Sequence, residues 1–334
     1  MPPTTMTQLI GQTPVMSIEV PNQAGHLVLK LEKNNPGGSM KDRMARRMVV
    51  AALQDGRLAP GGTIVESSSG NTAIGLALAA LEFGLRFIAV VDHHAAPDKI
   101  RMMRALGAEI RYVEGNYAED EVAVIERMRL AAQLGAQLPG AVFMNQLDNP
   151  ANPEGYIGLA EELIDQLSDG IDAFVGCVGT GGSITGIAGR LKRHNPSVRT
   201  VGVEPAGSTL FGKAGHPYYQ SGTGMPDGVK PARALDLGCI DQAVQVTDTE
   251  AFETARYLAC HNGLLVGGSS GGAIYKALEL IAAGKLSGTV VAMVADGGEK
   301  YLGTIFDDEW MAKRGLLDPA IAARLDGWLC GKSH

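Results

Sequence analysis

A lysine in a glycine-rich turn is the first group in this sequence that could do covalent chemistry. The turn reads Asn34-Asn-Pro-Gly-Gly-Ser-Met-Lys41-Asp-Arg43, and Ser39 can cap a helix expected over residues 42–54. The N-terminal end of a helix is positive and disfavours a charged amine. Lys41 is therefore biased toward the neutral, nucleophilic form that imine formation requires. On these residues alone, an ordinary solvated lysine is an equally good interpretation.

Two further loops are dense in hydrogen-bond donors. Glu66-Ser-Ser-Ser-Gly70-Asn71-Thr72 stands between an expected strand and an expected helix, where hydroxyls and backbone N–H groups suit a carboxylate. A plain N-cap would need only one of its three serines. Gly179-Thr180-Gly181-Gly182-Ser183 has the same setting, and its N–H groups, hydroxyls and helix dipole would hold a phosphate.

Three other binding or catalytic patterns are incomplete. Ile184 stands where the dinucleotide pattern GxGxxG needs its last glycine, and Ala214 stands where a Walker A loop needs a hydroxyl. Gly267-Gly-Ser-Ser-Gly271 has a serine-hydrolase spacing, but only the terminal His334 follows it. These patterns disfavour dinucleotide binding, nucleotide hydrolysis and serine hydrolysis.

Histidines do not point to a metal site. His93 and His94 are neighbours, without the spacing of metal ligands, so no metal is expected. Asp92 and the two histidines are interpreted as a solvated loop rather than as substrate contacts.

The elements that must position these loops alternate between strands and helices. Strands are predicted at 27–32, 62–66, 85–91, 109–113, 172–178, 199–204 and 288–294. Helices are predicted at 42–54, 71–83, 97–106, 119–134, 154–168, 183–194, 248–262 and 271–283. This alternation, with several continuously apolar strands, predicts an α/β protein with mostly parallel sheets buried on both faces. A long segment over 206–231 without periodicity is typical of a lid or binding loop.

The composition of the chain limits the classes of function that it could have. The chain has 334 residues, a formal charge of −7 and 44 glycines, about twice the usual glycine share. The negative charge argues against a nucleic-acid partner. No apolar run is long enough for a membrane span, and no CxxC motif occurs among the four cysteines. The N-terminal residues do not resemble a secretory signal, so a cytoplasmic protein is expected.

A potential imine-forming lysine, a carboxylate nest and a phosphate cradle together suggest pyridoxal phosphate acting on an amino acid. The motifs NPGGSxKDR, xSGNT, NPANP, GTGGS and DGGExYL are all present. On these motifs the chain resembles the cysteine synthase and cystathionine β-synthase family, from Gly11-Gln-Thr-Pro14 to Tyr301-Leu302. The resemblance implies the tryptophan-synthase-β-like fold (PLP fold type II): two three-layer α/β domains and a homodimer. The large cofactor-binding domain would span 1–44 and 150–334, and the small substrate-closing domain 45–149.

The resemblance also implies roles for individual residues. Lys41 would hold the cofactor covalently and move the α-proton, Asn71 would bond the 3′-oxygen, and Ser269 would face the pyridine nitrogen. The 5′-phosphate would be held by Gly179, Thr180, Gly181, Gly182 and Ser183. The substrate would be bound by Ser67, Ser68, Ser69, Gly70, Thr72, Gln146 and Gly224.

The implied reaction is β-replacement on an O-activated L-serine, O-acetylserine or O-phosphoserine, with sulfide giving L-cysteine. An amine nucleophile such as L-glutamate on O-phosphoserine is the first alternative, because the stretch Val91-Asp92…Pro97 and Tyr156 are similar to that branch. Cystathionine synthesis from homocysteine and serine/threonine dehydration stay open within the family. Outside it, a nicotinamide oxidoreductase and a catalytically silent binding protein are disfavoured. The sequence leaves the leaving group, the nucleophile and the pathway undetermined.

Overall fold

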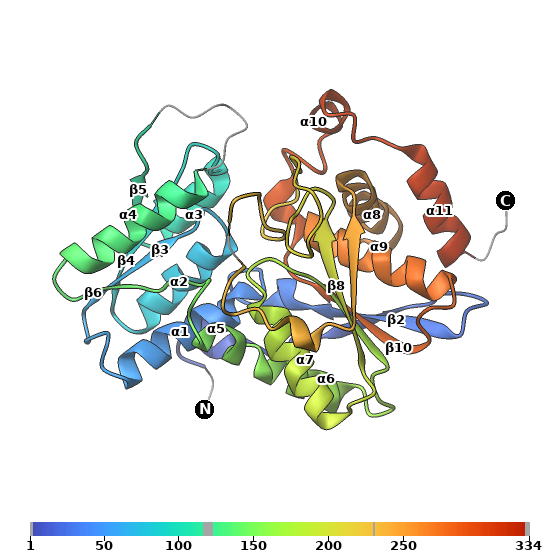
Figure 1. The fold of residues 1–334 in the computed structure, drawn as a ribbon, viewed down its shortest axis with the longest axis horizontal. Helices are drawn as coiled ribbons and strands as arrows, with labels where there is room; N and C mark the ends of the chain where they lie inside the picture. The colour runs from blue at the N-terminus through green and yellow to red at the C-terminus, as the bar shows by residue number, and fades with distance from the viewer. Residues whose placement is uncertain (1–2, 116–122, 230, 331–334) are drawn as a thin grey trace. The chain divides into compact units, whose positions relative to one another are not determined.

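The protein forms two compact units, in a computed structural model that describes residues 3–115, 123–229 and 231–330 (Figure 1). Unit 1 contains Asn35–Tyr156 together with the N-terminal segment up to Gly11, and unit 2 contains Gln12–Asn34 and the chain from Ile157 onward. Residues 3–11, 35–44 and 150–156 therefore lie in unit 1, whereas the resemblance implied the large domain for them. The predicted roles of the two domains, cofactor binding and closure on substrate, stay predictions.

Unit 1 is built on a parallel four-stranded sheet in the order β5-β4-β3-β6. Its strands are β3 Thr63–Ser67, β4 Arg86–Val91, β5 Glu109–Tyr112 and β6 Ala141–Phe143. Its helices are η1 Met6–Leu9, α1 Lys41–Gln54, α2 Asn71–Glu82, α3 Pro97–Ala105, α4 Val124–Gln137 and α5 Ala151–Glu154. Every residue of β4 from Phe87 to Val91 is buried, as expected for a strand covered on both faces. Helix α4 packs through Ala131 on the face that carries Val65 and Ile88.

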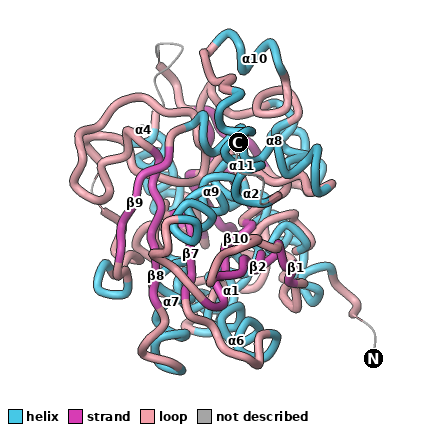
Figure 2. The backbone as a smooth tube through the Cα atoms, turned by 90° about the vertical axis from the view of Figure 1, so that its right-hand side faces the viewer, coloured by secondary structure: helices cyan, strands magenta, loops and turns pink. Residues whose placement is uncertain are grey.

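Unit 2 contains a six-stranded sheet in the order β1-β2-β10-β7-β8-β9, which Figure 2 displays as a row of strands. Only the β1–β2 pair is antiparallel. Its strands are β1 Val15–Ile18, β2 Gly25–Leu31, β7 Ala173–Cys177, β8 Arg199–Pro205, β9 Gln242–Val246 and β10 Gly288–Val294. Its helices are η2 Glu32–Asn34, α6 Ile157–Gln166, α7 Gly182–His194, η3 Leu237–Cys239, α8 Asp248–Asn262, α9 Gly268–Ala282, η4 Gly298–Tyr301, α10 Asp308–Lys313 and α11 Pro319–Leu329. The core lies between this sheet and α8 and α9.

The expected α/β class with mostly parallel sheets is confirmed, and all seven predicted strands occur within two residues of their predicted bounds. The three strands not predicted, β1, β6 and β9, are three to five residues long and have no regular alternation of polar and apolar residues. The helix predicted over 154–168 is confirmed as α6, Ile157–Gln166, but it begins three residues later than predicted, because α5 ends at Glu154. Gly155 lies between them, where an added Cβ would stand 2.6 Å from the Cα of Met44. The helix predicted over 119–134 begins at Val124, with 119–122 outside the described residues.

The sheet topology gathers loops at one edge of each unit. In parallel strands the carboxyl ends meet at the same edge, where ligands of α/β proteins collect. In unit 1 these are the segments after β3, β4 and β6, and in unit 2 those after β7, β8 and β10. No helix in the described parts of the chain is long and apolar enough to cross a membrane.

Candidate active site

Lys41 is the first residue of α1, at the positive end of the helix dipole. Its backbone N–H donates to the Ser39 hydroxyl over 3.2 Å. The helix N-cap is Met40 rather than the expected Ser39, although the serine hydroxyl still satisfies one of the free N–H groups. The preceding turn is held by Asp42, whose carboxylate accepts from the Gly37 N–H. The turn therefore fixes the position from which the Lys41 side chain leaves the helix.

The predicted carboxylate loop runs from the end of β3 at Ser67 to the start of α2 at Asn71. The Ser68 hydroxyl accepts from the Gly70 N–H over 3.2 Å, and the Thr72 hydroxyl donates to Gln146 Oε1 over 2.8 Å. Thr72 and Gln146 are 74 residues apart, so the fold brings this predicted pair together. The loop presents hydroxyls and backbone N–H groups at a helix N-terminus, a donor set that suits a carboxylate.

Glu66 lies beneath this loop and was not predicted as a functional residue. Its carboxyl accepts from the Ser67 N–H over 2.8 Å and from the Gln146 N–H over 3.2 Å. Burial raises the pKa of Glu66 to about 8, against the opposing effect of these hydrogen bonds and of Arg127. Glu66 therefore ties together two segments of the predicted substrate site.

The interpretation of Asp92 as part of a solvated loop was wrong. Asp92 is 1% exposed, and its carboxylate lies 3.3 Å from Arg127 Nε on α4. Another nitrogen of the guanidinium, Nη1, donates to the Ser69 hydroxyl over 3.2 Å. His93 and His94 are exposed, as interpreted. Sequence reasoning missed Arg127, whose only signal is a cation on the sheet-facing side of an amphipathic helix.

In unit 2, the predicted phosphate loop joins β7 to α7. Gly181 is the N-cap of α7 with φ +83°, in the left-handed region that glycine adopts without strain. An added Cβ there would stand 2.4 Å from Leu235 Cβ. The first N–H groups of a helix have no partner within it and suit a phosphate. Ser183, in the first turn of α7, adds a hydroxyl.

Gly224, predicted to bind substrate, lies against this same loop. Its N–H donates to the Val178 carbonyl over 2.7 Å, and the Thr223 hydroxyl donates to the same carbonyl over 3.0 Å. Gly224 has φ +75°, and an added Cβ would stand 2.7 Å from the Tyr218 hydroxyl oxygen. Within the irregular segment, the residues around Gly224 are thus anchored beside the predicted phosphate loop.

Ser269 is the second residue of α9, whose first turn is tied to two neighbouring strands. The Ser269 carbonyl accepts from the Cys177 thiol over 3.0 Å at the end of β7. The Ser270 hydroxyl accepts from the Ala295 N–H over 3.0 Å, just after β10. Burial raises the pKa of Cys177 to about 12, so this thiol stays protonated and packs as a structural group.

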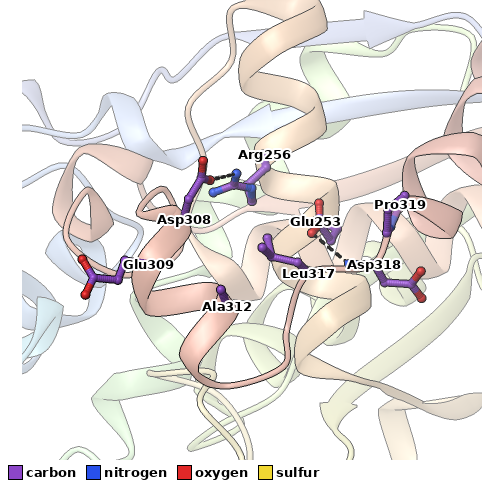
Figure 3. A pocket seen from close by; sticks show the side chains of 8 residues that line it. All are labelled: Glu253, Arg256, Asp308, Glu309, Ala312, Leu317, Asp318 and Pro319. Atoms are coloured by element: carbon purple, nitrogen blue, oxygen red, sulfur yellow. Dashed lines mark hydrogen bonds and ion pairs between the residues drawn. The ribbon is translucent and has the colours of Figure 1, made fainter.

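A hollow on unit 2 is lined by none of the predicted site residues. It has a volume of about 540 Å³, and Figure 3 shows Glu253, Arg256 and Asp318 among its lining residues. Its polar groups satisfy one another, because Arg256 pairs with Asp308 and Glu253 accepts from the Asp318 N–H. Among the described residues, no group of three or more metal-ligating side chains could hold a metal ion.

Residues 6–297 match the profile of the family described as "Pyridoxal-phosphate dependent enzyme". The chain belongs to this family. Several named relatives align with nearly the whole of this chain. A protein of Sinorhizobium fredii named "Putative cysteine synthase" is 81% identical over 331 residues, covering 99% of this chain and 98% of the relative.

Two further relatives differ in their named reactions. The N-(2-amino-2-carboxyethyl)-L-glutamate synthase of Ralstonia nicotianae is 38% identical over 92% of this chain and 91% of its own length. The crystal structure of the O-acetylserine dependent cystathionine beta-synthase of Helicobacter pylori has a TM-score of 0.82 at 34% identity, covering 91% of this chain and 98% of that chain. The predicted resemblance, fold class and pyridoxal phosphate dependence are therefore confirmed.

Each unit, taken by itself, carries donor groups of the kinds that pyridoxal phosphate requires. Unit 1 has a lysine and an asparagine at two helix starts, Lys41 and Asn71. Unit 2 has the glycine-rich N-terminus of α7, a donor set that suits a phosphate, and the serine that the resemblance assigns to the pyridine nitrogen, Ser269. When bound, pyridoxal phosphate supplies an electron sink for the α-carbon of an amino acid. The role of each residue toward the cofactor stays a prediction.

Proposed function

We propose that this enzyme replaces the activated β-oxygen substituent of an L-serine derivative by sulfide and produces L-cysteine. The observation that carries the proposal is the serine-rich loop at the N-terminus of α2, with Thr72 bonded to Gln146. In a pyridoxal-phosphate-dependent enzyme, such a loop suits the carboxylate of an amino-acid substrate. The 81% identity to a relative named as a cysteine synthase supports the same reaction.

The residues of this chain would divide the work between binding and proton transfer. The loop Ser67–Thr72 and Gln146 would bind the substrate carboxylate and hold its α-carbon near Lys41. The Lys41 amine would take the α-proton, and acetate or phosphate would leave with its bonding electrons. Sulfide, as HS⁻, would then add at the vacated β-carbon, and Lys41 would return a proton to the α-carbon to give L-cysteine. Ser269, a neutral hydroxyl, would not force protonation of the pyridine nitrogen, which suits β-replacement.

A second function, addition of L-glutamate to O-phospho-L-serine, is favoured by one group of features. The Ralstonia relative bears the name of such an amine-transferring synthase. The segment after β4 in this chain carries Asp92, and Tyr156 is fully buried. We rank this reaction second because the phosphate loop keeps the ordinary GTGGS sequence.

The test is a titration of the purified, cofactor-loaded enzyme, followed by its visible spectrum. O-acetyl-L-serine and O-phospho-L-serine are added separately, then sulfide, homocysteine or L-glutamate, and the product is identified by mass spectrometry. A spectral response that sulfide reverses, with L-cysteine as product, supports the first proposal. A response to O-phosphoserine alone that only L-glutamate reverses overturns it in favour of the second. Lys41→Ala is the control, and it should lack the visible band that borohydride bleaches in the parent.

The proposed assembly and domain closure rest on the resemblance to the family. We propose a homodimer that works in the cytoplasm, with a small domain over 45–149 that closes on the substrate. Light scattering of the loaded enzyme tests the dimer, and a mass of one chain would overturn it. Cell fractionation with an antibody tests the compartment. A comparison of scattering curves with and without O-acetylserine tests the closure.

A further inference from the structure

Arg127 on α4 is a buried cation with two directed contacts in unit 1. Its side chain is 12% exposed. Nε lies 3.3 Å from the carboxylate of Asp92, which follows β4, and Nη1 donates to the Ser69 hydroxyl over 3.2 Å. The planar fork of a guanidinium can serve two partners at fixed angles, which a lysine ammonium cannot do. Arg127 therefore links a buried carboxylate to the predicted substrate-carboxylate loop.

The charges around Arg127 hold the guanidinium in place. Burial lowers the pKa of Arg127, while the carboxylates of Asp92 and Glu66 raise it. Removing one partner from a buried pair is strongly unfavourable, so the pairing with Asp92 holds the guanidinium through its Nε atom. An ion pair with a purely structural role would need only Asp92. The guanidinium also donates a hydrogen bond from Nη1 to the Ser69 hydroxyl in the loop.

The contact with Ser69 has a consequence for the direction of its hydroxyl. A serine hydroxyl has one hydrogen to donate and two lone pairs to accept. Because the Ser69 oxygen accepts from a cation, its own hydrogen points elsewhere, and the charge makes the O–H a stronger donor. An incoming carboxylate needs a donor of this kind.

We propose that Arg127 is a positioning residue for substrate binding, which orients the Ser69 hydroxyl as a donor to the substrate carboxylate. The proposal rests on the proposed function, because it assumes that Ser69 meets the carboxylate of an amino acid. Asp92 acts one step further away, by fixing the guanidinium. Arg127 itself touches neither cofactor nor substrate in this role.

The test compares Arg127→Lys with Arg129→Lys, a matched change at an exposed position of the same helix. Arg127→Lys keeps a positive charge opposite Asp92 but loses the fork that reaches Ser69. We expect the KM for the serine donor to rise about ten- to a hundredfold, the range for losing one charged hydrogen bond. The kcat, the visible spectrum and the KM for the nucleophile should stay within about twofold, and Arg129→Lys should match the parent.

A double-mutant cycle separates positioning from a merely structural role. In a Ser69→Ala background, Arg127→Lys should no longer change the KM for the donor, because the hydroxyl it orients is absent. An equal effect in both backgrounds, or an unchanged KM in the single variant, would overturn the proposal. If Arg127→Lys does not fold, Asp92→Asn is measured instead. It should raise the same KM by a smaller factor, and an unchanged KM would again refute the role.

Failure of this inference can be told apart from failure of the proposed function. If the parent enzyme responds to neither O-acetylserine nor O-phosphoserine, both fail together. If the parent responds and the Arg127 variant responds at the same donor concentration, only the positioning role fails.

Discussion

The phosphate loop allows a sharp prediction at Gly181. Gly181 caps α7 with φ +83°, and an added Cβ would stand 2.4 Å from Leu235 Cβ and 2.6 Å from its Cδ1. Carbon atoms do not approach so closely, so Gly181→Ala must move either the loop or the segment around Leu235. Gly189 in the same helix offers the opposite case, because nothing lies within 4 Å of its added Cβ.

The expected loss of stability in Gly181→Ala has two causes. A non-glycine residue in the left-handed region costs about 1–2 kcal/mol, and overpacking a filled site costs about 1–3 kcal/mol. Gly181→Ala should therefore lower the free energy of unfolding by about 2–5 kcal/mol. Gly189→Ala lies in a helix interior, where alanine is favoured over glycine by about 0.5–1 kcal/mol, so it should stabilise.

Both variants are measured by chemical denaturation of the apo and the cofactor-loaded protein. If the loop at Gly181 holds the cofactor phosphate, the loss in Gly181→Ala should be larger in the loaded protein, since the distorted loop binds pyridoxal phosphate more weakly. The Gly189→Ala variant should keep the affinity of the parent. Equal stabilities for the two variants in the apo form would refute the steric reasoning. An unchanged cofactor affinity in Gly181→Ala would refute the placement of the phosphate.

Three further predictions concern buried groups. Lys30→Met should lower the unfolding free energy by about 3–5 kcal/mol, because it removes the ammonium that lies 2.8 Å from the buried Glu162 carboxylate. The double variant Lys30→Met/Glu162→Leu should recover most of that loss in urea denaturation, and no recovery would contradict the pairing. The pKa of Glu66 is raised from 4.5 to about 8, so its contribution to stability is full below pH 4.5 and is lost as the pH rises through about 8. Glu66→Gln should remove this pH dependence, worth at most about 5 kcal/mol, and a parallel pH profile would contradict it. Iodoacetamide should label the exposed Cys260 and spare Cys177, whose buried thiol has a pKa of about 12; mass spectrometry of the native protein would expose early labelling of Cys177.

The strands and their loops could be read from sequence because their signals are local. The run Phe87–Val91 is continuously apolar, and such a run predicts a strand buried on both faces. The glycine and serine residues of the loops at 66–72 and 179–183 stand directly between a strand and a helix, where backbone donors are free. Strand β9, Gln242–Val246, escaped prediction because it is only five residues long, lies at the edge of its sheet, and has two glutamines that break up its apolar residues without regular alternation.

The supports of the site could not be read in this way, because they join residues that are distant along the chain. Asp92 and Arg127 belong to the segment after β4 and to α4, and neither carries a local mark of its partner. Glu66 looks like an ordinary residue at the end of a strand. Its carboxyl accepts from the adjacent Ser67 N–H, but it meets the Gln146 N–H only after β3 and β6 have paired.

The sequence by itself determined the fold class, the family and the dependence on pyridoxal phosphate. Hydrophobic periodicity and loop composition involve residues that are close together along the chain. Both can therefore be recognised from the sequence alone. Tertiary structure alone decided the burial of Asp92, the raised pKa of Glu66 and the bond between Arg127 and Ser69. Burial and pairing depend on which residues the fold brings within a few ångströms of one another. The separation of two residues along the sequence does not predict that distance.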